Sequence, residues 1–274
     1  MELALLGRDI SLSFSPALHA LLDSMSGEKN LYSLIDVGKL GRSVFEKLNL
    51  TDGYNVTSPY KCEMASLLGC LDDSALSCGA VNTVVTLRGK AEQSDEGEVR
   101  GKGYNTDGAG LCEYIRTSGK KAGKVLIIGF GGAAKAAADA FLRSGSEVSF
   151  VVRNVVGICG KEAYIKRGAA FFALGNESGK FDLLVNATPV GRLTDGKLVS
   201  DPALLMTGEV IDMNYGRESF LSAQCRRLGV PYCDGIGMLV WQAILSRRIW
   251  GLIDLGKRAD EAMHEIRRIW KDKK

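Results

Sequence analysis

The stretch KVLIIGFGGAAKA, residues 124–136, decides the fold of this 274-residue chain. Its first half is a continuous apolar run, of the kind found in a parallel sheet that is covered on both faces. Its second half begins the pattern G-x-G-x-x-A, and the alanine-rich residues that follow predict a helix over 133–144. A further strand is expected at 147–152. A strand, glycine turn, helix and strand in this order are typical of a dinucleotide-binding Rossmann unit.

Each small residue of this loop has a physical role. Gly129 permits the tight turn out of the strand, and Gly131 lets a pyrophosphate approach the backbone. Ala134 is small enough for the helix to pack close to the sheet. The positive N-terminus of the helix then points free N–H groups at the phosphates. We therefore expect a nicotinamide dinucleotide as cofactor, and we interpret the chain as an oxidoreductase of α/β fold.

The residues after the second strand indicate which cofactor is preferred. An NAD enzyme usually carries an acid there, about 20 residues past the glycines, to bind the ribose 2′-OH. This chain has Val152, Arg153 and Asn154 instead. A guanidinium suits a 2′-phosphate because it forms a charge-assisted fork. Arg153 therefore predicts NADP, the alternative being an ordinary surface arginine.

Composition argues against several other classes of protein. The formal net charge is only +3, so there is no reason to expect a nucleic-acid partner. No apolar stretch reaches membrane-spanning length, and the N-terminus lacks the basic and long apolar regions of a signal peptide. The seven cysteines form no CxxC pair, and with only two histidines a zinc site is poorly supported. We expect a soluble cytoplasmic protein with reduced thiols, no membrane partner and no metal.

Strand and helix patterns alternate along the rest of the chain. Apolar and β-rich runs predict strands at 3–6, 30–37, 53–57, 81–87, 99–104, 169–174, 183–186 and 210–213. Helical spacing predicts helices at 16–24, 44–50, 60–68, 107–119, 238–254 and 258–270. The polar residues 88–98 predict a hairpin turn. This alternation predicts a layered α/β fold, and the length suits two domains.

A pair of serines precedes the first predicted helix. Ser13 and Ser15 are two residues apart, so in an extended segment both hydroxyls face the same way and could bind one carboxylate. The alternative is that Ser15 caps the helix and Ser13 has no role.

Three more polar clusters fall where strands should end. They are NVTSPYK at 55–61, GAVNT at 79–83 and NTDGAG at 105–110. Together they offer Lys61, Asp107 and several neutral hydrogen-bonding groups, a set that suits a polyhydroxylated ligand. A Lys–Asp pair can also transfer a proton to a carbonyl oxygen as hydride arrives. The alternative is a structural salt bridge with turn-forming residues, and residue types alone leave both open.

Seven motifs in the same order resemble the shikimate dehydrogenase family. The matching pieces extend from Gly7 to Gln242, which is nearly the whole chain. They are S-x-S-P at 13–16, N-V-T-x-P-x-K at 55–61, G-A-V-N-T at 79–83, N-T-D-G-x-G at 105–110, G-x-G-G-A at 129–133, N-A-T at 186–188 and D-G-x-G-M-L-x-x-Q at 234–242.

The resemblance implies a role for each site residue. Lys61 and Asp107 would be the catalytic acid–base pair at the ring hydroxyl that is oxidised. The substrate carboxylate would bind to Ser13, Ser15 and Tyr215, and the ring hydroxyls to Thr57, Asn82 and Gln242. The cofactor contacts would be Gly129, Gly131, Gly132, Ala133, Arg153, Thr188, Met213 and Gly235.

The resemblance also implies an architecture and a reaction. A substrate-binding domain would comprise 1–107 and 237–274, an NADP-binding Rossmann-like domain would comprise 108–236, and the active site would lie in the cleft between them. The reaction would be the reversible NADPH-dependent reduction of 3-dehydroshikimate to shikimate in aromatic amino-acid (chorismate) biosynthesis. The alternatives are a quinate/shikimate dehydrogenase using NAD or NADP, and a non-catalytic shikimate-binding sensor. The protein would be a monomer or homodimer, and the sequence leaves open whether it is fused to, or excised from, another enzyme of the pathway.

The chain departs from the family pattern in three places. Leu12 stands where the family commonly has His, and Asp9 where it has Pro. The family's Asn-Arg-Thr is Val152-Arg153-Asn154 here, and the second basic residue that often follows a few positions later is missing. The resemblance therefore predicts a weaker site for the 2′-phosphate.

Overall fold

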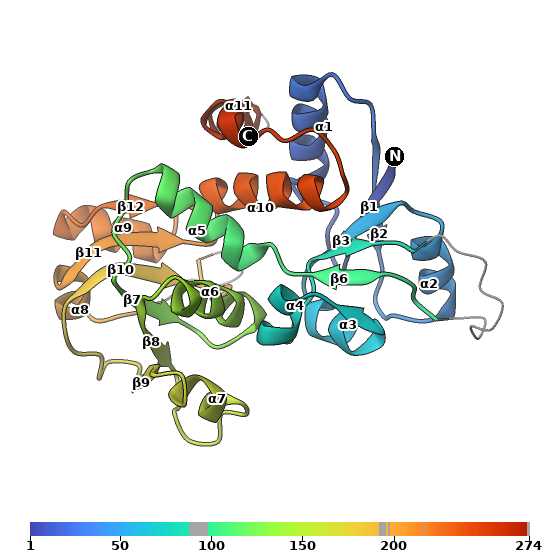
Figure 1. The fold of residues 1–274 in the computed structure, drawn as a ribbon. Helices are drawn as coiled ribbons and strands as arrows, with labels where there is room; N and C mark the ends of the chain where they lie inside the picture. The colour runs from blue at the N-terminus through green and yellow to red at the C-terminus, as the bar shows by residue number, and fades with distance from the viewer. Residues whose placement is uncertain (88–97, 192–195, 197, 217, 273–274) are drawn as a thin grey trace. The chain divides into compact units, whose positions relative to one another are not determined.

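The computed structural model describes residues 1–87, 98–191, 196, 198–216 and 218–272. The predicted hairpin turn at 88–98 lies almost entirely outside these residues. The chain divides into two compact units, and the first comprises Met1–Gly110 and Leu239–Lys274. The second comprises Leu111–Met238. Each contains a six-stranded sheet within the described residues, which confirms the predicted α/β class (Figure 1).

The sheet of the first unit has the strand order β2-β1-β3-β5-β6-β4. Its strands are β1 (Glu2–Gly7), β2 (Leu31–Asp36), β3 (Gly53–Val56), β4 (Cys70–Leu71), β5 (Thr83–Val85) and β6 (Lys102–Tyr104). Strand β1 is parallel to β2 and β3, whereas β5 is antiparallel to both β3 and β6. The carboxyl ends of β1, β3 and β6 and the start of β5 therefore lie at one edge of the sheet.

Helices from both ends of the sequence complete the first unit. They are α1 (Ser15–Ser26), α2 (Arg42–Asn49), α3 (Lys61–Leu67), α4 (Asp73–Cys78), most of α10 (Ile236–Ile249), a 3-10 turn (Gly256–Arg258) and α11 (Ala259–Asp272). Directly after α10, the Trp250 Nε1–H donates to the backbone oxygen of Val84 in β5 at 2.9 Å. This contact ties the C-terminal segment to the first sheet.

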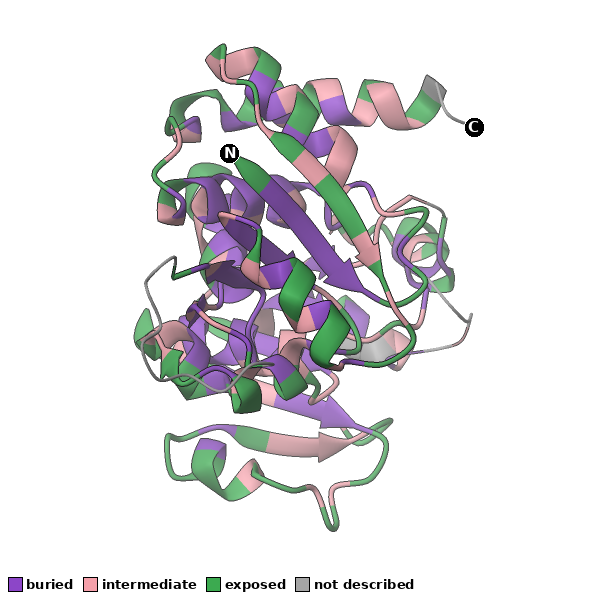
Figure 2. Cartoon of the chain, turned by 90° about the vertical axis from the view of Figure 1, so that its right-hand side faces the viewer, coloured by how far each residue is buried: buried purple, intermediate pink, exposed green. Residues whose placement is uncertain are grey.

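The core of the first unit is the apolar face of this sheet with helices packed on it. Strand β1 is buried along almost its whole length, whereas the neighbouring edge strand β2 is mostly exposed and has no buried residue (Figure 2). The buried side chains include Leu6, Val56, Tyr60, Met64 and Val84. Burial of such residues is the main stabilising contribution to a unit of this size.

The sheet of the second unit is parallel throughout, with the order β12-β11-β10-β7-β8-β9. Its strands are β7 (Lys124–Ile128), β8 (Glu147–Val152), β9 (Ala170–Ala173), β10 (Phe181–Asn186), β11 (Thr207–Asp212) and β12 (Tyr232–Cys233). The helices are most of α5 (Asp107–Thr117), then α6 (Gly132–Arg143), α7 (Lys161–Ile165), α8 (Asp201–Leu205) and α9 (Phe220–Leu228). The quoted stretch thus forms β7, the glycine turn and the start of α6, as predicted.

Two details of the sequence-based expectation are wrong. The helix expected to end at residue 254 ends at Ile249, because Gly251 adopts a left-handed conformation (φ 76°) that stops it. Ser15 does not cap α1, because Phe14 is the N-cap residue. Instead, the Ser13 hydroxyl accepts the N–H of Ser15 at 3.3 Å, which satisfies a helix donor that would otherwise lack an acceptor. The short elements β4, α4 and β12 were also not predicted from the sequence.

Candidate active site

The polar motifs of the first unit meet at one edge of its sheet. Lys61 begins α3 shortly after β3, and Asp107 begins α5 shortly after β6. Asn82 immediately precedes β5, and its backbone oxygen accepts the N–H of Val56 at 2.9 Å. Strand pairing therefore brings together groups from three distant motifs.

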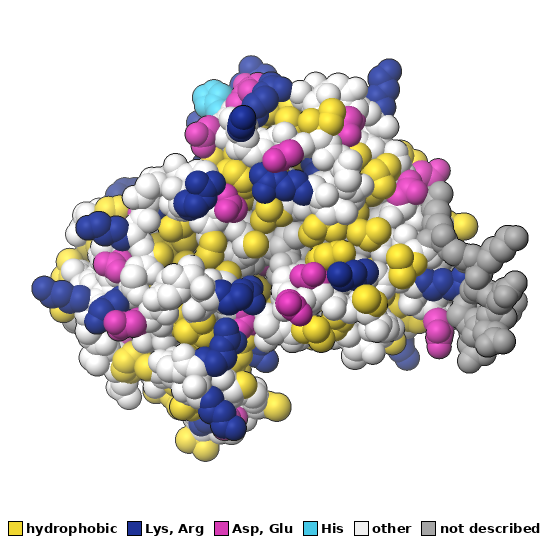
Figure 3. All heavy atoms as spheres, in the orientation of Figure 1, with side chains coloured by type: hydrophobic (Ala, Val, Ile, Leu, Met, Phe, Trp, Pro, Cys, Tyr) yellow, Lys and Arg dark blue, Asp and Glu magenta, His cyan; other side chains and the backbone are white. Residues whose placement is uncertain are grey.

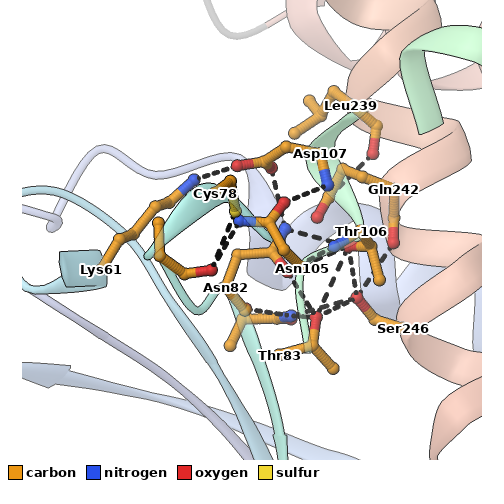
Figure 4. Close-up of polar contacts among 12 residues, drawn as sticks. Lys61, Cys78, Asn82, Thr83, Asn105, Thr106, Asp107, Leu239, Gln242 and Ser246 are labelled. Atoms are coloured by element: carbon orange, nitrogen blue, oxygen red, sulfur yellow. Dashed lines mark hydrogen bonds and ion pairs between the residues drawn. The ribbon is translucent and has the colours of Figure 1, made fainter. Parts of the chain in front are cut away.

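Lys61 and Asp107 form an ion pair at the centre of this edge. The distance from Lys61 Nζ to Asp107 Oδ2 is 2.6 Å. The side chain of Lys61 is 20% exposed and that of Asp107 is 6% exposed, so the pair is partly screened from water but reachable. Asn82 Nδ2 donates to the other carboxylate oxygen at 2.8 Å (Figure 4). The carboxylate is therefore held by one charged and one neutral donor.

The NTD motif folds around the side chain of Asn82. Asn82 Oδ1 accepts the backbone N–H of Thr106 at 2.8 Å, and Nδ2 donates to Thr106 Oγ1 at 2.9 Å. Asn105 Oδ1 accepts the N–H of Asp107 at 3.1 Å, which fixes the first turn of α5. Because both donors of Asn82 are engaged, a substrate hydroxyl that accepts from Asn82 would have to displace one of these contacts.

Ser246 joins α10 to this network, and the sequence did not single it out. It is fully buried, and its hydroxyl lies 2.8 Å from Thr83 Oγ1 and 3.3 Å from Thr106 Oγ1 (Figure 4). Asn55 Nδ2 donates to the same hydroxyl at 3.2 Å. A lone serine in an apolar helical pattern gives no sign of this role, because its partners are far away in sequence.

The remaining expected substrate contacts lie at different places. Ser13 precedes α1, and Ser15 is its first residue. Thr57 directly follows β3, and its N–H donates to the oxygen of Leu6 at 2.9 Å. Gln242 lies beside the first turn of α5, since a Cβ on Gly110 would come within 2.7 Å of its backbone nitrogen. Its Nε2 donates to the Leu239 oxygen at 2.9 Å.

Tyr215 follows β11 and belongs to the second unit. Its expected contact with the substrate carboxylate stays a prediction.

The glycine turn of the second unit has the conformation that its sequence requires. Gly129 has φ 102°, and a Cβ there would lie 2.9 Å from Thr188 Cγ2. Gly131 differs, because a Cβ there would meet no atom within 4 Å. The backbone at Gly131 therefore borders open space in which a pyrophosphate could lie. Gly132 and Ala133 form the start of α6 directly behind it.

Thr188, Met213 and Gly235 are connected through the ends of the neighbouring strands. Asn186 Oδ1 accepts from Thr188 Oγ1 at 2.8 Å, and the Asn186 backbone oxygen accepts the N–H of Met213 at 3.0 Å. A Cβ on Gly235 would come within 2.3 Å of the Met213 oxygen, so only glycine fits this approach. Thr188, Met213 and Gly235 thus follow the ends of β10, β11 and β12 and lie along the carboxyl edge of the second sheet.

Asp212 organises this edge and was not predicted from the sequence. Its Oδ1 accepts from Asn186 Nδ2 at 2.9 Å and from the Asn214 backbone N–H at 3.0 Å. Burial raises the pKa of Asp212, and the hydrogen bonds from Asn214 and Asn186 oppose that rise. The sequence signal that could have identified Asp212 is its place as an acid in a predicted apolar strand.

A cavity of about 1080 Å³ opens beside the glycine turn, a volume suited to a large ligand. The cavity is lined by Gly129 and Gly131 of the turn, by Thr188 just after β10 and by Arg153 just after β8. Arg153 is exposed and is followed by Asn154, which lines the same cavity. The cavity therefore combines a glycine turn, a helix N-terminus and a cation, the parts that a phosphorylated dinucleotide requires.

Two further observations concern the described residues only. No helix among them combines the length and apolar composition that crossing a membrane requires. Within the same residues, no group of three His, Cys, Asp or Glu side chains is placed to hold a metal ion.

Comparison with known proteins identifies the family. A model of the shikimate dehydrogenase substrate binding domain matches residues 5–84, inside the first unit. A shikimate dehydrogenase (NADP(+)) from Methanococcus maripaludis is 30% identical over 273 residues, covering 94% of this chain and 92% of the relative. One from Xanthomonas campestris pv. campestris is 33% identical over 266 residues, covering 90% of this chain and 89% of the relative.

Solved structures agree with these sequences over almost the whole chain. Shikimate 5-dehydrogenase from Thermus thermophilus, in complex with shikimate, has a TM-score of 0.80 at 28% identity and covers 99% of both chains. A chorismate mutase/shikimate 5-dehydrogenase fusion protein from Clostridium acetobutylicum has a TM-score of 0.80 at 26% identity, covering 98% of both chains. Fold, motif order and sequence identity together confirm the resemblance, and the chain belongs to the shikimate dehydrogenase family.

Proposed function

We propose that this chain is an NADP-dependent shikimate dehydrogenase, which reversibly reduces 3-dehydroshikimate to shikimate. The observation that carries the proposal is the ion pair of Lys61 and Asp107, held by Asn82 at the polar edge of the first sheet. Relatives named shikimate dehydrogenase (NADP(+)) support both the substrate and the cofactor.

Lys61 is the proton donor in this proposal. Its Nζ protonates the substrate oxygen at C3 while negative charge develops there, and the ammonium stabilises that charge. The reduced nicotinamide, when bound, supplies the hydride. In the reverse direction Lys61 accepts the proton from the ring hydroxyl.

Asp107 orients Lys61 and the substrate. Its two oxygens are bound by Lys61 and Asn82, so the carboxylate cannot turn without breaking a contact. The backbone N–H of Asp107 is held by Asn105 as well. A fixed carboxylate of this kind keeps the ammonium within reach of one substrate atom, which is the positioning that acid–base catalysis requires.

Neutral side chains bind the rest of the substrate. We assign the carboxylate to the hydroxyls of Ser13, Ser15 and Tyr215. Thr57 and Gln242 bind ring hydroxyls, and the Oε1 of Gln242 accepts no hydrogen bond from the described residues, which leaves it for a hydroxyl donor. Asn82 would contact a ring hydroxyl only by exchanging one of its present partners.

The second unit supplies the cofactor site in this proposal. Gly129, Gly131, Gly132 and Ala133 form the turn and helix start that bind the pyrophosphate. The open space at Gly131 and the cavity beside it fit that group. Arg153 binds the 2′-phosphate, and Thr188, Met213 and Gly235 border the remainder of the dinucleotide.

The state of the cysteines bears on where the enzyme works. All seven cysteines are free thiols, as is usual for proteins of the reducing cytoplasm. We propose a cytoplasmic monomer or homodimer that acts in aromatic amino-acid biosynthesis. The similar protein from Clostridium acetobutylicum is a fusion with chorismate mutase. Fusion of this chain to another enzyme of the pathway stays a prediction.

A two-by-two assay tests the function against its rivals. The purified chain is given shikimate or quinate, each with NADP or NAD, and formation of the reduced cofactor is followed. The proposal predicts the highest kcat/KM for shikimate with NADP. Equal efficiency with quinate or NAD would favour the relaxed-specificity enzyme. Binding of shikimate without turnover would favour the non-catalytic sensor.

A further inference from the structure

The 2′-phosphate of NADP needs more positive charge than the loop after β8 supplies. A phosphate monoester carries between one and two negative charges at neutral pH. Arg153 is the only basic residue between 152 and 158. We propose that Lys135 of α6 is the second cation that binds this phosphate and so favours NADP over NAD. This inference rests on the cofactor part of the proposed function.

Lys135 and Arg153 line the same cavity. Arg153 reaches it from the carboxyl end of β8, and Lys135 from the first turns of α6, where its N–H donates to Gly131 O at 2.9 Å. The described residues that line this cavity include these two cations and no acid. Charge in the cavity therefore favours an anionic group.

Packing places the Lys135 ammonium on the side of the glycine turn that faces β8 and β9. Its Nζ lies 4.8 Å from the ring centroid of Phe130, which stands in the turn itself. Phe130 meets Phe150 of β8 edge-on at 5.0 Å and Phe171 of β9 at 5.3 Å. In a Rossmann unit the adenosine ribose binds at the end of the second strand, which is β8 here. The 2′-phosphate is thus expected on the same side as Lys135.

The charge of Lys135 is available to a ligand. Asp139 lies one turn further along α6, at the spacing where a lysine and an acid often pair. However, Asp139 is buried and pairs with Arg167, and it also accepts from Tyr164 Oη at 3.3 Å. Within the described residues neither Lys135 nor Arg153 forms an ion pair.

The neighbouring surface carries more basic than acidic side chains, although Glu162 of α7 is exposed there. Figure 3 shows Lys and Arg side chains gathered over α6 and α7 of the second unit. Basic residues of these helices and the residues just after them are Lys135, Arg143, Lys161, Lys166 and Arg167. Of these, Lys135 alone lines the cavity and Arg167 is paired with Asp139, so the wider surface contributes only long-range attraction for a phosphorylated ligand.

Binding of two small ligands to the full chain tests this role without any turnover. Calorimetry compares 2′,5′-ADP, which carries the 2′-phosphate, with 5′-AMP, which lacks it. Lys135→Met removes the charge, Lys135→Arg restores it, and Lys121→Met is the control at an exposed lysine outside the cavity. We expect Lys135→Met to weaken 2′,5′-ADP about tenfold, the size of a lost charge-assisted hydrogen bond. Its affinity for 5′-AMP, and both affinities of the arginine and control variants, should change less than about twofold.

Three results would overturn the inference. Unchanged 2′,5′-ADP binding in Lys135→Met would show that Lys135 does not contact the phosphate. An equal loss for both ligands would place Lys135 at the shared 5′-phosphate instead. If the unaltered protein bound both ligands equally, the NADP assignment in the proposed function would fail as well, whereas the first two results leave that assignment standing.

Discussion

At the scale of single residues, His19 shows how burial changes a titratable group. Its ring stacks on Tyr32 with centroids 4.1 Å apart and lies near Trp250 at 5.7 Å. Tyr32 in turn donates to Asn55 Oδ1 at 2.7 Å, so His19 packs against the polar network of the first unit. Burial, and then the nearby Arg247 guanidinium, lower the pKa of His19 from 6.5 to about 3.

This shift predicts how stability depends on pH. Because the folded pKa lies below the unfolded one, the unfolded chain binds the proton more readily between pH 6.5 and 3. The contribution of neutral His19 to the free energy of unfolding is complete above pH 6.5 and is lost as the pH falls from there toward 3. At about 1.4 kcal/mol per pH unit, the loss between pH 6.5 and 5 is about 2 kcal/mol.

Urea unfolding at pH 7 and at pH 5 measures this contribution. His19→Phe keeps a buried ring without the titration, so it should lose about 2 kcal/mol less than the unaltered protein on acidification. His264→Gln is the control, because His264 is exposed. An identical loss in His19→Phe and the unaltered protein would refute the assignment.

At the scale of elements, the two leading glycines of the turn before α6 serve different purposes. Gly129 has a left-handed backbone and no room for a Cβ, whereas Gly131 has φ −80° and open space beside it. Gly129→Ala should therefore destabilise the fold by about 1 to 3 kcal/mol. Gly131→Ala should unfold like the original chain yet bind NADPH and NADH more weakly, because the methyl group occupies the space for the pyrophosphate.

Thermal unfolding and cofactor binding of both variants check this contrast. If Gly131→Ala bound NADPH normally, the pyrophosphate would have to lie elsewhere. If Gly129→Ala were as stable as the original chain, the turn would not depend on its left-handed residue.

Helix α10 contributes to the site through Ser246. Ser246→Ala removes a hydroxyl shared by Thr83, Asn55 and Thr106, all of which are buried. Each partner keeps another hydrogen bond, Asn55 and Thr106 to Asn82 and Thr83 to Asn82 Oδ1, so the loss of the shared hydroxyl should cost about 0.5 to 1.5 kcal/mol of stability. We also expect a lower kcat with an unchanged KM for NADPH, because Thr106 immediately precedes Asp107.

Urea unfolding and steady-state kinetics measure both effects. Ser66→Ala serves as the control, since Ser66 is exposed and its hydroxyl, among the described residues, bonds within its own helix to Glu63 O at 2.7 Å. Unaltered stability and kcat in Ser246→Ala would contradict this account of α10.

At the scale of the whole molecule, local sequence patterns predict more of the fold than of the site. Apolar runs and glycines locate β7, β8 and α6, because strand burial and turn geometry depend on neighbouring residues. Ser246 and Lys135 could not be found that way. Ser246 gains its role from partners up to 191 positions away. The position of the Lys135 ammonium depends on the Phe130 ring, which packs on residues of β8 and β9. Residue types offered Lys61 and Asp107 as a candidate pair, and the family motifs then assigned the pair its role. The sheet topology explains why the two residues meet.

Shikimate-dependent formation of NADPH, compared between the unaltered chain and Lys61→Met, tests the central claim most directly. Removing the ammonium should lower kcat by about 10²- to 10⁴-fold, the range for loss of a general acid, with little change in shikimate affinity. Lys39→Met, at an exposed lysine of the same unit, should leave kcat unchanged. Near-normal turnover in Lys61→Met would contradict the assignment of the Lys61–Asp107 pair.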